Sequence, residues 1–101
     1  MTAARATRAG NWHVYIVLTA AGLLYTGIST DPARRLREHE AGKKGARSLR
    51  GKGPLKIVFL ATAANRSAAS ILEARIKALT RVEKLRLISG KLRIEDAGAS
   101  V

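Results

Sequence analysis

A short segment near the start of the chain, WHVYIVLTAAGLLYTG, constrains the fold more than any other part of the sequence. Residues 12–18 are rich in β-branched and aromatic side chains and predict a strand, and residues 23–28 predict its partner. The three residues 20–22 suit a hairpin loop in which Gly22 adopts the left-handed conformation. The segment therefore predicts an antiparallel hairpin.

The hairpin carries two tyrosines, Tyr15 and Tyr25, ten residues apart. Side chains alternate between the two faces of a strand, and a loop with an odd number of residues pairs odd-numbered positions with odd-numbered positions. We therefore expect both tyrosines on one face of the sheet, whereas a two-residue loop would place them on opposite faces. Because tyrosines in strands more often serve packing, the pair alone does not define a site.

A helix is predicted directly after the hairpin. Asp31 and Pro32 are typical of a helix start, an N-cap acid followed by proline, and the helix is expected to run to about Glu40. Arg35 and His39 lie one helical turn apart, with Cβ atoms about 5–6 Å from each other, so both can face one site. The same spacing also suits two solvated side chains.

The second half of the chain predicts a third strand over residues 55–60 and two further helices. Asn65 or Ser67 caps the second helix, which runs to about Leu79. The predicted buried face of this helix consists of Ala68, Ile71, Leu72, Ile76 and Leu79.

A capping box at residues 80–83 predicts the third helix, which ends near Gly90. The predicted order is β-β-α-β-α-α, and its simplest packing is an α+β fold with a small three-stranded, mainly antiparallel sheet flanked by helices. We expect the domain to span residues 11–90, after a disordered basic lead at 1–10 and before a tail at 91–101.

The chain is strongly basic, with 19 Lys and Arg against 7 Asp and Glu and a net charge of +12. The excess is concentrated between Arg34 and Lys56, which include a predicted glycine-rich loop at 42–53. Concentrated positive charge favours a polyanion, here DNA or RNA, over a membrane surface or a purely solubilising role. The loop residues expected to bind nucleic acid are Lys43, Lys44, Arg47, Arg50 and Lys52.

The sequence contains no cysteine, which excludes disulfides and thiolate metal sites and fits a reducing cytoplasm. The apolar run from Val14 to Leu24 superficially resembles a signal peptide, but cleavage there would delete the first strand. The run is also shorter than the roughly 20 apolar residues needed to span a bilayer. We expect a cytoplasmic, nucleoid-associated protein without a membrane partner.

Glu73 lies in the middle of the second predicted helix and is the only acid between Glu40 and Glu83. A divalent metal bound to phosphate needs few carboxylates, because phosphate oxygens and water supply its other ligands. The alternative is an ion pair with Lys77 one turn later, worth about 0.2–0.5 kcal/mol.

Together these residues resemble the GIY-YIG nuclease superfamily, particularly its small single-domain bacterial members. The matching blocks, in chain order over about residues 12–90, are Val14-Tyr15-Ile16, Tyr25-Thr26-Gly27, Gly27-x-x-x-Asp31-x-x-x-Arg35-Leu36-x-x-His39, Gly51-Lys52-Gly53-Pro54-Leu55 and Ala69-Ser70-x-x-Glu73-x-x-Ile76-Lys77. The first block lacks its glycine, Thr26 replaces an isoleucine, and no asparagine follows Glu73.

The resemblance implies metal-dependent hydrolysis of phosphodiester bonds in DNA, structure-selective or weakly sequence-specific, in repair or recombination. Glu73 would hold one Mg²⁺ or Mn²⁺, and Arg35 would bind the charged transition state. Tyr15 would help to remove a proton from the attacking water, and Tyr25 would position that water or the phosphate. His39 would orient Tyr15 or relay its proton, so the identity of the base stays open between the tyrosines and His39.

Two other functions stay open. The chain could be a nucleic-acid-binding protein on the same fold without catalysis, or a subunit that needs a partner nuclease. A binder that had lost catalysis would be expected to lack at least one member of the catalytic set. Because all five of its members are present, the sequence favours the enzyme.

Overall fold

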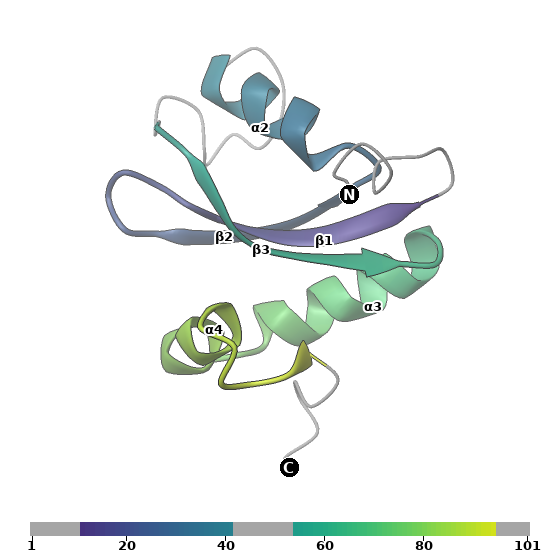
Figure 1. Cartoon of the computed structure of the whole chain (residues 1–101), viewed down its shortest axis with the longest axis vertical. Coiled ribbons are helices and arrows are strands. Elements are labelled where there is room, and N and C mark those ends of the chain that lie inside the picture. The colour runs from purple at the N-terminus through teal and green to yellow at the C-terminus, as the bar shows by residue number, and fades with distance from the viewer. Residues whose placement is uncertain (1–10, 42–53, 95–101) are drawn as a thin grey trace.

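The computed structural model describes residues 11–41 and 54–94, which form three strands and three helices (Figure 1). The strands are β1 (Trp12–Leu18), β2 (Leu24–Ser29) and β3 (Lys56–Ala63), and the helices are α2 (Pro32–Ala41), α3 (Arg66–Lys77) and α4 (Arg81–Ile88). The predicted α+β class and element order are confirmed. No helix in these two ranges is long and apolar enough to cross a bilayer.

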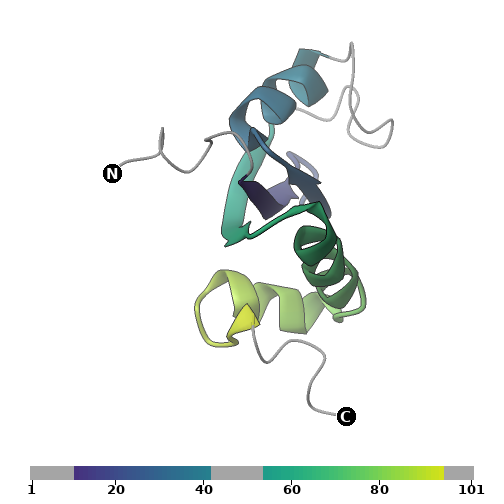
Figure 2. The same ribbon diagram turned by 90° about the vertical axis from the view of Figure 1, so that its right-hand side faces the viewer.

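The sheet has the order β2-β1-β3, so β1 is central and pairs antiparallel with both neighbours. In this register Tyr15 stands opposite Gly27 of β2 and Leu60 of β3, and an irregularity interrupts the β1–β3 ladder between Ile16 and Val17. Helix α2 covers one face of the sheet, while α3 and α4 cover the other (Figure 2). The two faces of β1 therefore belong to two different packing layers.

The β1–β2 turn is the three-residue loop that the sequence predicts. The Thr19 amide donates to the Leu23 carbonyl at 2.9 Å, and the Gly22 amide donates to the Thr19 carbonyl at 2.9 Å. Gly22 has φ of +87°, the left-handed conformation that glycine adopts at little cost. The odd loop pairs odd-numbered with odd-numbered positions, so Tyr15 and Tyr25 do share one face.

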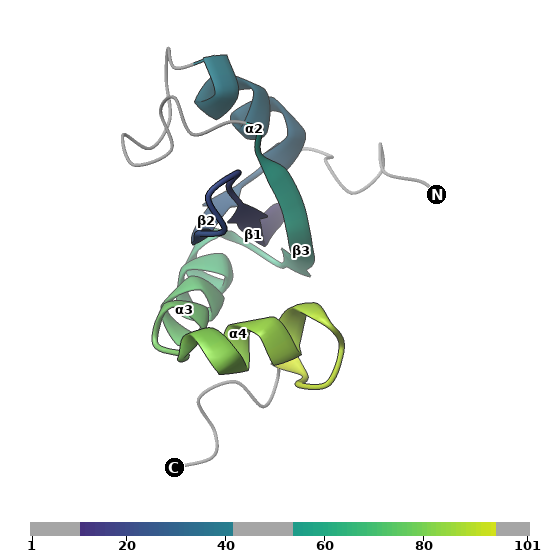
Figure 3. The same cartoon turned by 90° about the vertical axis from the view of Figure 1, so that its left-hand side faces the viewer.

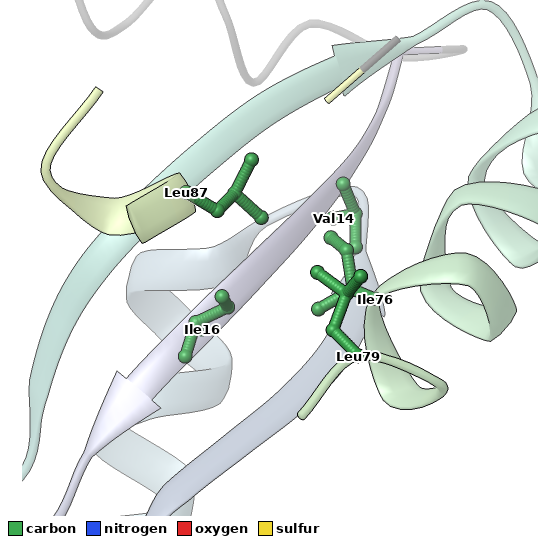
Figure 4. Packing of buried hydrophobic residues seen from close by; sticks show 5 residues of the cluster. All are labelled: Val14, Ile16, Ile76, Leu79 and Leu87. Carbon is green, nitrogen blue, oxygen red and sulfur yellow. The ribbon is translucent and has the colours of Figure 1, made fainter. Parts of the chain in front are cut away.

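The main core lies on the face of the sheet away from the tyrosines. Its buried residues come from β1, α3, the α3–α4 connection and α4, and they are Val14, Ile16, Ile76, Leu79 and Leu87 (Figure 4). Because apolar burial is the main favourable term in folding, this cluster fixes α3 beneath the sheet. The position of α3 then decides where its polar side chains point.

Helix α3 differs from its prediction in which residues it buries. Ile71 was expected in the core but is 54% exposed. The buried line instead follows Ala69, Leu72 and Ile76, at spacings of three and four residues. Ile71 is rotated about 100° from Leu72 around the helix axis, which turns it to solvent.

The caps of the last two helices agree with the sequence. Asn65, not Ser67, caps α3, since its side-chain oxygen accepts from the Ala68 amide at 2.8 Å. Thr80 and Glu83 form the predicted capping box of α4. These caps satisfy amides that have no partner within the helix and so fix where each helix begins.

The described chain continues for four residues after Gly90. Gly90 follows α4 with φ of +83°, and the Lys91 amide donates to the Arg86 carbonyl at 2.8 Å. Leu92 and Ile94 then pack against the main core. The start of the segment predicted as a tail thus contributes to packing, while residues 95–101 lie outside the described part.

Candidate active site

A second, smaller cluster lies between the tyrosine face of the sheet and α2. Tyr15, Val17 and Leu55 are buried there, and Leu36 of α2 packs against them together with Tyr25. Leu36 therefore anchors α2 over the two tyrosines.

Hydrogen bonds fix both ends of α2 relative to the strands. At its start, the Asp31 side chain accepts from the Arg34 amide at 3.1 Å, and the Ser29 hydroxyl accepts from the Asp31 amide at 2.9 Å. Near its end, Glu40 accepts from the Leu55 amide at 3.1 Å. The helix is consequently placed well enough to present specific side chains to the tyrosine face.

The Tyr15 ring lies across the backbone of Gly27, its cross-strand partner. A Cβ built on Gly27 would stand 2.8 Å from the Tyr15 Oη and 3.2 Å from Cε2 of Tyr25. Contacts below 3.0 Å are essentially absent between real Cβ atoms and their neighbours, so any other residue would displace the tyrosine. Gly27 is required here by close approach and not by its backbone angles.

Arg35 projects from α2 toward this site and is held by Glu38. One Glu38 oxygen accepts from Arg35 Nη1 at 2.9 Å, and the other accepts from Arg34 at 2.8 Å. The Arg35 side chain keeps 33% exposure, so part of its guanidinium faces solvent. A carboxylate that holds an arginine in one orientation prepares it to bind a second anion.

Four structural elements converge on the Tyr15 hydroxyl. Burial is the largest influence on the Tyr15 pKa and raises it above its usual value, and the nearby Tyr25 and Glu73 act in the same direction. The charge of Arg35 and its hydrogen bond to Tyr15 act in the opposite direction but do not outweigh burial. The side chains of β1, β2, α2 and α3 are thus close enough to affect one hydroxyl.

His39 is buried in the same layer, with 1% of its surface exposed. Its ring meets the ring of Tyr25 edge-on, with centroids 5.9 Å apart. Burial lowers the pKa of His39, the positive charge of Arg35 lowers it further, and Glu38 partly opposes both. His39 is therefore neutral at pH 7.

Glu73 reaches the site from α3, below the sheet. Its side chain is 22% exposed, and one carboxylate oxygen lies 3.2 Å from Lys77 Nζ, so the i,i+4 ion pair that the sequence offered as the alternative to metal binding is formed. Among the described residues, no group of three or more His, Cys, Asp or Glu side chains could hold a metal by itself. A lone carboxylate fits a cation whose remaining ligands come from phosphate and water.

The structure thus brings the predicted site residues of the described chain together. Tyr15 is affected by Tyr25, Arg35 and Glu73, and His39 contacts Tyr25. The five basic loop residues Lys43, Lys44, Arg47, Arg50 and Lys52 lie outside the described residues.

Two residues that shape the site were given no role by the sequence reasoning. Glu38 follows Arg34 and Arg35 at helical spacings of four and three, a pattern that predicts ion pairs. Gly27 could have been found from the hairpin register, which places it opposite Tyr15. Neither residue carries out chemistry in isolation, and both act by positioning a neighbour.

A model of the GIY-YIG catalytic domain matches residues 11–86, which include every element that builds the site. The fold and the converging side chains therefore define a GIY-YIG domain, the fold of a nuclease superfamily. The chain belongs to this family.

The similar proteins are small bacterial ones. The chain is 59% identical over 80 residues to a UPF0213 protein of Aeromonas salmonicida (strain A449), a match that covers 79% of this chain and 58% of that protein. It is 52% identical over 83 residues to a UPF0213 protein of Yersinia pestis (strain Pestoides F), covering 82% and 86%. The solution NMR structure of a UPF0213 protein from Bacillus halodurans superposes with a TM-score of 0.52 at 38% identity, covering 80% of this chain and 85% of that one.

Proposed function

We propose that the protein is a metal-dependent endonuclease that hydrolyses phosphodiester bonds in DNA, with selectivity for structure or weak selectivity for sequence. The observation that carries the proposal is the convergence on Tyr15 of Tyr25, Arg35 and Glu73 from three other elements. A phenol, a guanidinium and a carboxylate around one point can bind a phosphate, balance its charge and hold a cation beside it.

Arg35 is the residue that stabilises negative charge. Phosphodiester hydrolysis places extra negative charge on the non-bridging oxygens in the transition state. A guanidinium stabilises this charge through charge-assisted hydrogen bonds. Glu38 holds the Arg35 side chain before substrate arrives, so less ordering is needed during the reaction. Tyr15 and Tyr25 lie beside Arg35 to orient the phosphate and the attacking water.

The proton of the attacking water is better accepted by His39 than by Tyr15. The raised pKa of Tyr15 keeps its hydroxyl protonated at neutral pH, so it begins the reaction as a hydrogen-bond donor. The lowered pKa of His39 leaves a neutral ring that can accept a proton at the same pH. Because His39 touches Tyr25, we assign the relay of this proton to the Tyr25–His39 pair.

Glu73 would hold the Mg²⁺ or Mn²⁺ that the family implies. A bound divalent ion polarises a phosphoryl oxygen and stabilises the leaving oxygen. Lys77 would have to give up part of its ion pair with Glu73 for this to happen, a small cost because that lysine is more than half exposed.

Two observations are also compatible with a second function. The raised pKa of Tyr15 and the Lys77 ion pair on Glu73 describe a site that is not poised for catalysis without substrate. A protein that binds DNA or RNA on this fold without cutting it would show the same features. It would bind with the same residues but leave every substrate intact.

Incubation of the full chain with nicked, branched and single-stranded DNA and with RNA, each with Mg²⁺ or Mn²⁺, tests the proposal. We expect cleavage of at least one DNA substrate, stopped by a chelator and by Glu73→Gln. Tight binding without cleavage of any substrate would support the binding protein and overturn the nuclease. Cleavage by Glu73→Gln at the wild-type rate would contradict the assigned role of this carboxylate.

A further inference from the structure

Helix α3 carries a line of polar side chains on one side, which we call the α3 polar stripe. It consists of Arg66, Ser70, Glu73 and Lys77. Their spacings of four, three and four residues keep them on one side of a helix. Arg66, Ser70 and Lys77 are exposed, and only Glu73 is partly covered.

One member of the α3 polar stripe, Glu73, links it to the tyrosine site. Glu73 affects the pKa of Tyr15 on the opposite side of the sheet. Helix α3 packs mainly against β2 and β1, and β2 is an edge strand (Figure 3). The Glu73 carboxylate thus acts on Tyr15 from the α3 side of the sheet, where α3 packs against the edge strand β2.

Arg66, at one end of the stripe, lies against an aromatic ring. Its guanidinium lies over the ring of Trp12, 5.7 Å from the ring centroid. None of the ion pairs among residues 11–41 and 54–94 involves Arg66. An arginine stacked on an aromatic ring keeps its donors and its charge available for an anion.

We propose that the α3 polar stripe binds the sugar-phosphate backbone of the strand being cut, with Arg66 on a phosphate about three nucleotides from the reacting one. This inference rests on the proposed function, because it places the reacting phosphate at Glu73. Arg66 and Glu73 are seven residues apart, which is about 10.5 Å along the helix axis. Each strand of a duplex advances about 3.4 Å along the duplex axis per phosphate, so with α3 parallel to that axis the distance corresponds to about three phosphates.

Lys77 would bind the same backbone on the other side of Glu73. It lies four residues further, about 6 Å along the axis, which corresponds to about two phosphates. Ser70, between Arg66 and Glu73, offers a hydroxyl donor to the intervening backbone. Such contacts fix the position of a strand and do not read its sequence.

Arg75 provides a matched control on the same helix. It is exposed and carries the same charge, but it lies two residues after Glu73, about 200° around the helix axis. Arg66→Gln and Arg75→Gln therefore remove equal charge from opposite sides of α3. A general attraction of nucleic acid to a basic protein would be weakened equally by both substitutions.

The test measures dissociation constants of the full-length wild type, Arg66→Gln and Arg75→Gln for a 20-base-pair duplex in chelator, over a range of salt concentrations. We expect Arg66→Gln to bind several-fold more weakly and its log–log salt slope to become shallower by about 0.9, one phosphate contact. Arg75→Gln should keep the wild-type slope, and Arg66→Lys should recover most of the slope because it keeps the charge. Equal slopes for Arg66→Gln and Arg75→Gln would overturn the proposal that the α3 polar stripe binds the backbone.

The same experiment separates failure of the stripe from failure of the proposed function. If the wild type binds the duplex and the two glutamine variants behave alike, the α3 polar stripe does not bind the DNA backbone as proposed, and the nuclease proposal still stands. If the wild type shows no salt-dependent binding to duplex or single-stranded DNA or to RNA, both proposals fail. The cleavage assay with Glu73→Gln then decides the nuclease proposal independently of Arg66.

Discussion

The Tyr15 hydroxyl lies over the backbone of Gly27, so closely that a methyl group at position 27 would stand 2.8 Å from its oxygen. This relationship joins the two tyrosine-containing blocks of the hairpin into one structural unit. The glycine of the second block leaves the space that the tyrosine of the first block occupies. The position of that hydroxyl is the basis of the proposed site.

Gly27→Ala should displace Tyr15 and reduce both stability and activity. Overpacking of a buried site of this kind typically costs about 1–3 kcal/mol of unfolding free energy. Denaturant unfolding of Gly27→Ala, Tyr15→Leu and the double variant measures the coupling. We expect the added methyl to cost much less when Tyr15 is already leucine, and strictly additive costs would show that the clash is absent.

Tyr15 should ionise above the usual tyrosine range, because burial raises its pKa more than Arg35 lowers it. The chain contains two tyrosines, so phenolate absorbance resolves their titrations, and Tyr15→Phe identifies which step belongs to Tyr15. Arg35→Gln should move the Tyr15 step still higher, since it removes the lowering influence. A Tyr15 step at or below about pH 10 would contradict this environment.

His39 should make stability depend on pH below neutrality. Its pKa is lower in the folded chain than the usual 6.5, so the unfolded state binds more protons in the interval between the two values. The contribution is therefore fully present above about pH 6.5 and is lost as pH falls through the folded pKa. Denaturant unfolding at several pH values should show a shallower decline for His39→Gln, and an unchanged pH profile would exclude the assigned environment.

Arg35 and Arg37 offer a comparison within one helix. Both are arginines of α2, but Arg35 hydrogen-bonds to Tyr15 while Arg37 is exposed. Arg35→Gln should lower single-turnover cleavage by about 10²-fold or more, the usual loss for a donor that stabilises transition-state charge. Arg37→Gln should act mainly on binding and mainly at low salt, so equal rate losses in the two variants would reject a specific role for Arg35.

The sequence predicts those parts of the site that depend on local rules. Alternation along β1 and β2 and an odd loop ending in Gly22 place both tyrosines on one face, and the structure has them there. Helical spacing likewise brings Arg35 close enough to His39 for its charge to lower the pKa of that histidine. These relationships involve neighbours in the chain or in a hairpin, where backbone geometry alone decides the outcome.

The remaining relationships depend on packing between distant segments. The approach of Glu73 to Tyr15 follows from the main core, which fixes α3 beneath the sheet, and no spacing in the sequence encodes that distance. The burial of Tyr15 is likewise a tertiary property, and it is the reason why we propose this tyrosine as a hydrogen-bond donor among the roles that the sequence left open. Ile71 is a further example. Which residues of α3 are buried depends on how the helix packs against the sheet, and helical spacing alone did not predict that Ile71 would be exposed.

The most direct test of the account is single-turnover cleavage of a branched DNA by wild type, Glu73→Gln and Glu40→Gln in Mg²⁺. Glu40→Gln removes the same charge, and its amide oxygen can still accept from the Leu55 amide. The account predicts metal-dependent cleavage by the wild type and by Glu40→Gln, and a loss of at least about 10²-fold in Glu73→Gln, which should still bind the DNA. Equal rates for the two glutamine variants, or no cleavage by the wild type under any metal condition, would contradict it.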